Sequence, residues 1–189
     1  MKIIITEEQL NNISNEFLKN SLFKYWDIQK KKGNEPKLDE IVYDIAGVKK
    51  YTSGDSVLVR PIWYEYNGGY EKLFSELKEK TKGKRFNIKG DNNLNIVVHV
   101  DYVTSYGVSN SGGMVDLIVS IDGGTMYYEF YSEDSNEPEI VNNADIFEVY
   151  NDLEYDRADL TQFVKDTVED YFDKKFEYLG IPLYVEVNW

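Results

Sequence analysis

The side chains able to act as acids, bases or nucleophiles are of few kinds in this sequence. It contains no cysteine and one histidine, His99, so a catalytic thiol and a multi-histidine metal site are both excluded. His99 precedes Asp101 by two positions in a strand-like segment, and Asp116 could approach from a neighbouring strand. Nucleophiles for a histidine base would have to come from the loop that follows, at Ser105, Ser109 or Ser111. These residues are sufficient for a small hydrolase built on His99, but their spacing does not single out a catalytic site.

The carboxylates suggest two further kinds of site. The segment 91–95 begins like an EF-hand calcium loop, but Ile96 stands where that loop needs glycine, and 133–137 is a second acidic run. We read both as solvated loops. A pair of catalytic carboxylates is equally possible, although no spacing singles one out. The phosphate-binding loops GxxxxGK[ST] and GxGxxG are absent from the sequence. We therefore expect no enzyme activity and no cofactor.

The net charge and the hydropathy of the chain limit the classes of partner that it can bind. The chain has 34 acidic and 21 basic residues and a formal net charge of −13, which repels nucleic acids and anionic membranes. The sequence also has no apolar run long enough to form a transmembrane helix. We expect neither direct nucleic-acid binding nor membrane association, so the remaining partners are proteins.

Aromatic residues gather in two places, around Trp63, Tyr64 and Tyr66 and around Tyr127 and Tyr131. Alternation along a strand puts Tyr127 and Tyr131 on the face opposite Tyr128, so both faces of one sheet would carry rings. Tyrosine is enriched at protein interfaces, where it buries a large area and keeps a polar tip. Burial beneath the chain's own helices is the alternative. The five residues named first are our candidate interface residues.

The first part of the chain reads mainly as helical. A short strand over 1–5 precedes a helix that begins at Thr6, with Gln9 completing a capping box, and that stops at Gly33. Apolar residues at helical spacing predict further helices over 38–47 and 70–83. Between them, 57–66 reads as an extended segment that Pro61 keeps from the centre of a sheet.

From residue 86 the apolar period changes to two, which indicates strands. We expect a tight hairpin at Asp122-Gly123-Gly124, a longer loop over 105–113 and an exposed acidic loop over 132–139. A short helix over 146–153, an amphipathic helix over 160–176 and a closing strand over 181–187 follow. The alternating apolar residues are Phe86 and Ile88; Ile96, Val98, Val100 and Tyr102; Val115, Leu117, Val119 and Ile121; Met126, Tyr128 and Phe130.

This order of elements predicts an α+β fold: an antiparallel β-meander of about four to six strands packed with amphipathic helices. Helices lie at the N-terminal end, and a long C-terminal helix precedes the closing strand. We expect a single domain over 1–189, since the sequence shows no internal repeat and no linker.

The opening segment, Met1–Leu10, consists of a short apolar strand, a threonine cap and a helix that starts with Glu and Gln. In this it resembles the small acidic proteins encoded by tailed bacteriophages. The many lysine, asparagine and isoleucine residues and the scarcity of alanine indicate an AT-rich genome, as in such phages. The resemblance implies either a part of the virion or a factor that acts on the host.

Three functions follow as hypotheses. The first is a structural virion protein, a ring or collar subunit of the head–tail connector or tail, made in the host cytoplasm and bound to copies of itself and to other virion proteins. The alternative is an acidic inhibitor or DNA mimic, with Asp166, Glu169, Asp170 and Asp173 as its charged helix face. The third is the small hydrolase that uses His99 or a carboxylate pair. Large exposed apolar patches would favour the first, and a cleft around His99 the third.

Overall fold

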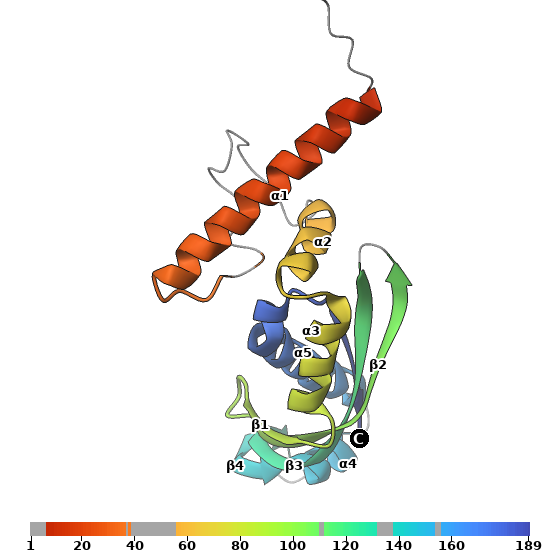
Figure 1. Ribbon diagram of the computed structural model, residues 1–189. Helices are drawn as coiled ribbons and strands as arrows, with labels where there is room; N and C mark the ends of the chain where they lie inside the picture. The colour runs from red at the N-terminus through yellow and green to blue at the C-terminus, as the bar shows by residue number, and fades with distance from the viewer. Residues whose placement is uncertain (1–6, 37, 39–55, 110–111, 132–137, 154–155) are drawn as a thin grey trace, which may run out of the picture. The chain divides into compact units, whose positions relative to one another are not determined.

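Figure 1 shows a computed structural model that describes the chain outside residues 1–6, 37, 39–55, 110–111, 132–137 and 154–155. The strand expected over 1–5 and most of the helix expected over 38–47 lie outside the described residues. The chain divides into two compact units, Met1–Leu73 with Val108–Gly113 and Glu177–Ile181, and Phe74–Gly107 with Met114–Phe176 and Pro182–Trp189. The expected single domain stays a prediction, and the units are described one at a time.

The first unit is built on α1 (Glu7–Lys31) and α2 (Ser56–Tyr66). The predicted helix is confirmed over Glu7–Lys31, whereas its predicted cap, Thr6, lies outside the described residues. The helix is followed by Gly33 at φ 79°, a conformation that glycine adopts without a steric cost. The prediction of an extended 57–66 is wrong, because α2 is a helix with Pro61 inside it. Proline removes one helical hydrogen bond, and the packing of Trp63 and Tyr66 against α1 offsets that loss.

Four aromatic rings join α1 to α2. Trp26 of α1 lies with its ring centroid 5.0 Å from that of Trp63 and 4.9 Å from that of Tyr66, and Phe23 meets Tyr66 at 5.1 Å. The Tyr66 hydroxyl donates a hydrogen bond of 2.9 Å to Asp27 Oδ1. Burial, and then the hydrogen bond to this carboxylate, raises the pKa of Tyr66 to about 12. The same rings that suggest an interface in the sequence therefore form a core inside this unit.

A short segment from near the C-terminal end completes this core. It consists of the 3₁₀ helix η2 (Glu177–Leu179) and Gly180, which has φ 66°. Trp63 Nε1 donates to the Leu179 carbonyl at 2.9 Å, and the Tyr64 hydroxyl donates to the Gly180 carbonyl at 3.1 Å. A Cβ atom at position 180 would lie 2.9 Å from the Trp63 ring, so glycine is required there both by φ and by space.

The second unit holds the sheet, with strand order β1-β2-β3-β4 and β5 paired to β3. Its strands are β1 (Arg85–Lys89), β2 (Asn95–Ser109), β3 (Gly112–Tyr131), β4 (Pro138–Asp145) and β5 (Leu183–Asn188). Strand β1 runs antiparallel to β2 and β4 antiparallel to β3, whereas β5 runs parallel to β3. In Figure 1, β2 and β3 are the two long green strands. The predicted α+β class with a closing strand is confirmed.

Strands β2 and β3 contradict two of our loop predictions. Strand β3 passes without interruption through Asp122-Gly123-Gly124, so no hairpin forms there. Gly124 instead lets β3 pass close to β2, because a Cβ at that position would lie 2.5 Å from the Asn95 carbonyl oxygen. The loop expected over 105–113 is mostly strand, since β2 reaches Ser109 and β3 starts at Gly112. Of the loop expected over 132–139, residues 132–137 lie outside the described residues, and the last two belong to β4.

The predicted helices of this part are confirmed as α3 (Tyr70–Thr81), which has residues in both units, α4 (Ile146–Asp152) and α5 (Arg157–Phe176). Asp145 caps α4 by accepting a hydrogen bond from the Phe147 amide at 2.8 Å. Helix α5 contacts β1 and β5 and turns one apolar face to the sheet, with the rings of Phe172 and Phe86 5.1 Å apart. Its buried residues are Leu160, Val164, Val168, Phe172 and Phe176.

The turn between β1 and β2 explains the segment that begins like a calcium loop. Asn92 and Asn93 adopt φ of 52° and 54°, and the Leu94 amide donates to the Asp91 carbonyl at 2.9 Å. Asparagine tolerates this left-handed conformation better than other non-glycine residues do. The asparagine-rich sequence is therefore explained by a tight turn.

Candidate functional site

His99 lies on the sheet face opposite α5, between two carboxylates. Its Nε2 is 2.6 Å from Asp101 Oδ1 on the same strand, and its Nδ1 is 2.5 Å from Asp122 Oδ1 on β3. Two further residues extend the chain of contacts: Arg85 Nε lies 2.7 Å from Asp122 Oδ2, and the Ser120 hydroxyl donates to Asp101 Oδ2 at 2.6 Å. We call these five residues, on three adjacent strands, the His99 network.

The geometry of this network limits what His99 can do. Each ring nitrogen of His99 lies within hydrogen-bond distance of a carboxylate oxygen. A general base needs a ring nitrogen that is free to accept a proton from a nucleophile, and in this arrangement both nitrogens face a carboxylate. Ser120 donates to Asp101 rather than to His99. The imidazole of His99 is thus held between two carboxylate groups on the sheet surface.

A second group of residues occupies the same face further along β2 and β3. The side chains of Tyr102, Tyr106 and Tyr184 are 62%, 44% and 48% exposed, and Met114 is 36% exposed. Asp116 of β3 pairs in register with Tyr184 of β5, which brings β5 into the group. We call Tyr102, Tyr106, Met114 and Tyr184 the tyrosine patch.

Asp116 lies among the residues of this patch. Partial burial, the negative charge of Asp116 and a hydrogen bond to it raise the pKa of Tyr106. The other patch tyrosine nearby, Tyr184, lies with its ring 5.6 Å from the Lys165 ammonium. Asp116 Oδ1 is buried, and no hydrogen-bond donor reaches it from the part of the chain that the structure describes. The patch therefore combines exposed rings with a carboxylate that bonds Tyr106 and whose Oδ1 atom has no donor among the described residues.

The structure separates the five interface residues predicted from sequence. Trp63 and Tyr64 are only 2% and 4% exposed and belong to the core of the first unit. Tyr66 is half-buried in the same ring cluster, so these three residues stabilise the fold. Tyr127 is half-buried on β3, where its hydroxyl donates to Glu129 at 3.1 Å. Tyr131 ends β3, and its side chain is outside the described part.

The sequence pattern did not predict the tyrosine patch, and it placed one patch residue, Tyr102, on the buried face of the sheet. Alternation from Ile96 to Val100 puts Tyr102 on the buried face, yet Tyr102 is 62% exposed and Val103 is buried in its place. The signal was present in the spacing of Tyr102, Thr104 and Tyr106, which alternate outward once the phase has changed.

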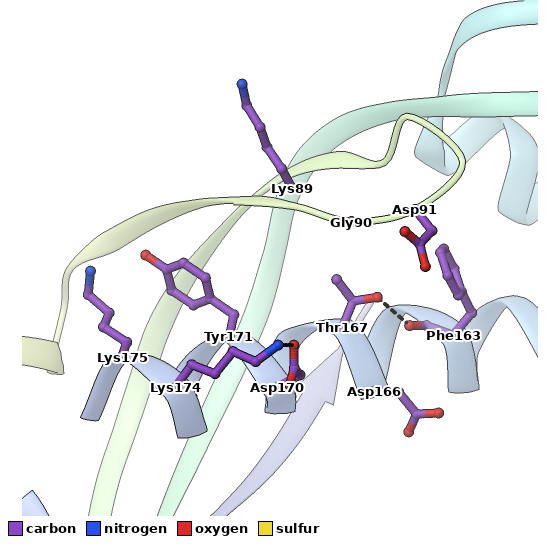
Figure 2. A pocket seen from close by; sticks show the side chains of 10 residues that line it. All are labelled: Lys89, Gly90, Asp91, Phe163, Asp166, Thr167, Asp170, Tyr171, Lys174 and Lys175. Carbon is purple, nitrogen blue, oxygen red and sulfur yellow. Dashed lines mark hydrogen bonds and ion pairs between the residues drawn. The ribbon is translucent and has the colours of Figure 1, made fainter. Parts of the chain in front are cut away.

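An open groove of about 930 Å³ runs between α5 and the β1–β2 turn, as Figure 2 shows. A Cβ on Gly90 would lie 2.8 Å from the Thr167 methyl group, which shows how closely the turn approaches the helix. Lys174 is paired with Asp170, and Lys175 lies 5.3 Å from the ring of Tyr171. The groove is lined by Lys89, Gly90, Asp91, Phe163, Asp166, Thr167, Asp170, Tyr171, Lys174 and Lys175. Its lining mixes both signs of charge.

The acidic face of α5 is likewise interrupted by lysines. Lys165 lies 3.6 Å from Glu169, and Lys174 pairs with Asp170, both one helical turn apart. Burial, together with the charges of Glu169 and Asp170, raises the pKa of Asp173. Helix α5 therefore does not present a regular row of uncompensated carboxylates.

No family model, curated protein or solved structure matches this chain. Within the described residues, no three or more His, Cys, Asp and Glu side chains gather as they would around a metal ion. None of the described helices combines the length and the apolar character needed to cross a bilayer. The function proposed for this chain therefore rests on its exposed residues.

Proposed function

We propose that this chain is a structural protein of a tailed-bacteriophage particle, a ring or collar subunit that works through contacts with other proteins. The observation that carries the proposal is the tyrosine patch on the face of β2, β3 and β5 that α5 leaves uncovered. Exposed aromatic and methionine side chains that lie next to one another are typical of surfaces that become buried on association.

The polar surroundings of the patch indicate what a partner would offer. Asp116 Oδ1 is buried without a donor among the described residues, and a hydrogen-bond donor from a partner would satisfy it. The nearby Asp101 and Glu186 add negative charge to the same face, and the whole chain is strongly acidic. A partner surface with lysine or arginine around an apolar centre would complement this face.

The same features speak for association over the other two hypotheses. Both nitrogens of His99 are engaged with carboxylates, which favours a structural role for the network over general-base catalysis. Lysines paired along α5 make that helix a poor imitation of a phosphate backbone. A net charge of −13 suits a ring subunit that must let DNA pass without binding it.

Quantitative mass spectrometry of purified particles from the source phage tests this proposal. Roughly a dozen copies per particle, or a small multiple, is the result expected of a ring subunit. Absence of the chain from particles that are otherwise complete would overturn the proposal.

The role of the patch is tested by assembly in cells that supply the chain in trans. The double variant Tyr102→Ser, Tyr184→Ser should fold but be depleted from particles, because both side chains are about half exposed or more. Ile140→Ser is the matched control, since Ile140 is 57% exposed on β4 and lies outside the patch. Equal incorporation of the double variant and the wild type would show that the patch is not the assembly surface.

A further inference from the structure

Lysines and aromatic rings come together at one end of the groove beside α5. The Lys175 ammonium lies 5.3 Å from the ring centroid of Tyr171 and 5.5 Å from that of Phe86. Figure 2 shows Tyr171, Lys174 and Lys175 toward this end of the groove, with Asp166 toward the other end. We call Phe86, Tyr171, Lys174 and Lys175 the lysine surface.

The lysine surface keeps positive charge and aromatic area available to a partner. Lys174 and Lys175 are both exposed, and the rings of Phe86 and Tyr171 are only half-buried. Within the described part of the chain, no carboxylate forms an ion pair with Lys175, and Lys174 pairs with Asp170 one helical turn away. Cations around partly exposed rings are the kind of surface that would complement the tyrosine patch.

The lysine surface and the tyrosine patch lie on opposite faces of one sheet and belong to the same compact unit. Phe86 pairs in register with the buried Val98, and its ring packs on Phe172 of α5. Tyr184 is exposed on the other face, since the next residue, Val185, is buried. The two surfaces of one chain therefore cannot meet each other, and a contact between them needs two copies.

The carboxylates of the tyrosine patch favour this pairing over a contact between two patches. Asp116 Oδ1 is buried and has no donor among the described residues, and Glu186 is exposed on the same face as Tyr184. Two patches brought face to face would set these acids against their own copies, and like charges across an interface are destabilising. The lysine surface offers ammonium donors instead.

We infer that the tyrosine patch of one copy binds the lysine surface of the next copy, head to tail. The inference rests on the proposed function, since it takes the patch to be an association surface. The contact is heterologous, so every added copy keeps one free patch or one free lysine surface for the next. Such contacts close into a ring when the rotation between neighbours permits it.

Sedimentation velocity of the full chain over the micromolar range is the first test. The wild type should grow beyond a dimer as its concentration rises, because a head-to-tail contact leaves a free surface at each end. A two-fold contact would stop at the dimer. A wild type that stays monomeric, or that stops at the dimer, overturns the inference.

Charge reversal tests which surfaces meet. Glu186→Lys and Lys175→Glu should each weaken association by at least about tenfold. The first variant makes the chain less acidic, so a general repulsion between chains would predict stronger association instead. Both changes in one chain, or an equimolar mixture of the two variants, should recover association because opposite charges then face each other again.

The matched control for the lysine variant is Lys24→Glu, since Lys24 is an exposed lysine of α1 outside both surfaces. It should associate as the wild type does. All these positions are exposed, so the variants should keep the circular dichroism of the wild type. Folded variants that fail to recover association when combined would contradict the pairing of these two surfaces.

Cross-linking tests the orientation directly because the chain contains no cysteine. Thr104 is exposed between Tyr102 and Tyr106, and Asp170 lines the groove beside Lys174. A short bismaleimide should link Thr104→Cys to Asp170→Cys in a mixture of the two variants, whereas neither variant should link to itself. Self-linking of Thr104→Cys would indicate a contact between two patches and overturn the inference.

Particle assembly separates this inference from the proposed function. We expect both Lys175→Glu and the double variant Tyr102→Ser, Tyr184→Ser to be depleted from particles. If only the double variant is depleted, the patch binds a different virion protein, so the proposed function stands and the inference is overturned. Absence of the wild type from particles overturns the proposed function, and the sedimentation result still decides the inference.

Discussion

Trp63 Nε1 donates a hydrogen bond of 2.9 Å to the main-chain carbonyl of Leu179, which lies far along the sequence. The indole is 2% exposed, so this contact fixes the η2 segment to α2 in an environment with little water. A buried carbonyl that loses its donor costs more than an exposed one, because water cannot replace the bond.

We predict that Trp63→Phe lowers the free energy of unfolding by about 2–3 kcal/mol, through lost ring area and an unsatisfied Leu179 carbonyl. Urea unfolding followed by circular dichroism measures the change. Trp189→Phe is the control: the Trp189 Nε1 has no hydrogen-bond partner among the described residues, so the same substitution breaks no bond there. Equal losses for the two variants would remove the hydrogen bond from the explanation.

Two glycines of the first unit separate backbone strain from steric contact. Both have positive φ, 66° at Gly180 and 79° at Gly33, but only at Gly180 would an added methyl group lie 2.9 Å from the Trp63 ring. Gly33→Ala should cost about 1 kcal/mol from strain alone, and Gly180→Ala should cost clearly more. Denaturation midpoints decide the order, and a smaller loss at Gly180 would contradict the packing described for that segment.

The His99 network should be measurable as a coupling energy. In a double-mutant cycle of His99→Gln and Asp122→Asn, we expect a coupling of about 1 kcal/mol, a modest value because His99 is one-third exposed. The exposed pair Lys174 and Asp170 is the comparison, for which we expect about 0.3–0.5 kcal/mol. A coupling near zero at His99 would mean that the network contributes nothing to stability.

Asp173 makes stability depend on pH in a defined direction. Its pKa is raised in the folded chain by burial and by Glu169 and Asp170, so its ionised form is less favourable folded than unfolded. Its contribution is therefore fully present below the unfolded pKa and is lost as pH rises through the folded pKa. Asp173→Asn should raise the urea midpoint at neutral pH, and the gain should vanish in acid.

Asp159→Asn is the matched change on the same helix. Asp159 lies in the first turn of α5, where a negative charge interacts favourably with the helix dipole, so its removal should lower the midpoint at neutral pH. The two aspartate variants should thus shift the midpoint in opposite directions. Shifts of the same sign would show that the surroundings of Asp173 do not disfavour its charge.

Periodicity was a good guide where one face of an element is buried along its whole length. The residues of α5 and the alternating strands from Phe86 to Val100 obey their periods because each faces a continuous core. The α+β class and the closing strand follow from those regular stretches. Helix α2 was misread because Pro61 and the β-branched residues suggest an extended chain, whereas the packing of Trp63 on Trp26 involves residues remote in sequence.

The candidate surface was harder to predict because it depends on changes of phase. The inward/outward alternation of side chains changes phase between Val100 and Val103, which turns Tyr102 outward. No residue type in the sequence predicts this change. The glycine pair at 123–124 was interpreted as a hairpin since the same dipeptide serves tight turns and close strand approach alike. Aromatic content showed that interfaces were possible, but only burial separated Trp63 and Tyr64 from Tyr106 and Tyr184.

The two strands that pair with one edge of β3 are synthesised at different times. That edge pairs with β5 at 115–120 and with β4 at 125–131, but the ribosome delivers β4, α4 and α5 before β5. Throughout that interval the amides and carbonyls of 115–120 on this edge have no strand beside them, and an open edge recruits strands from other chains. A nascent chain that stalls before Leu183 therefore exposes an unpaired, aggregation-prone strand edge in the middle of its sheet. Slow codons after α5 should lower the soluble yield without altering a single contact of the finished protein.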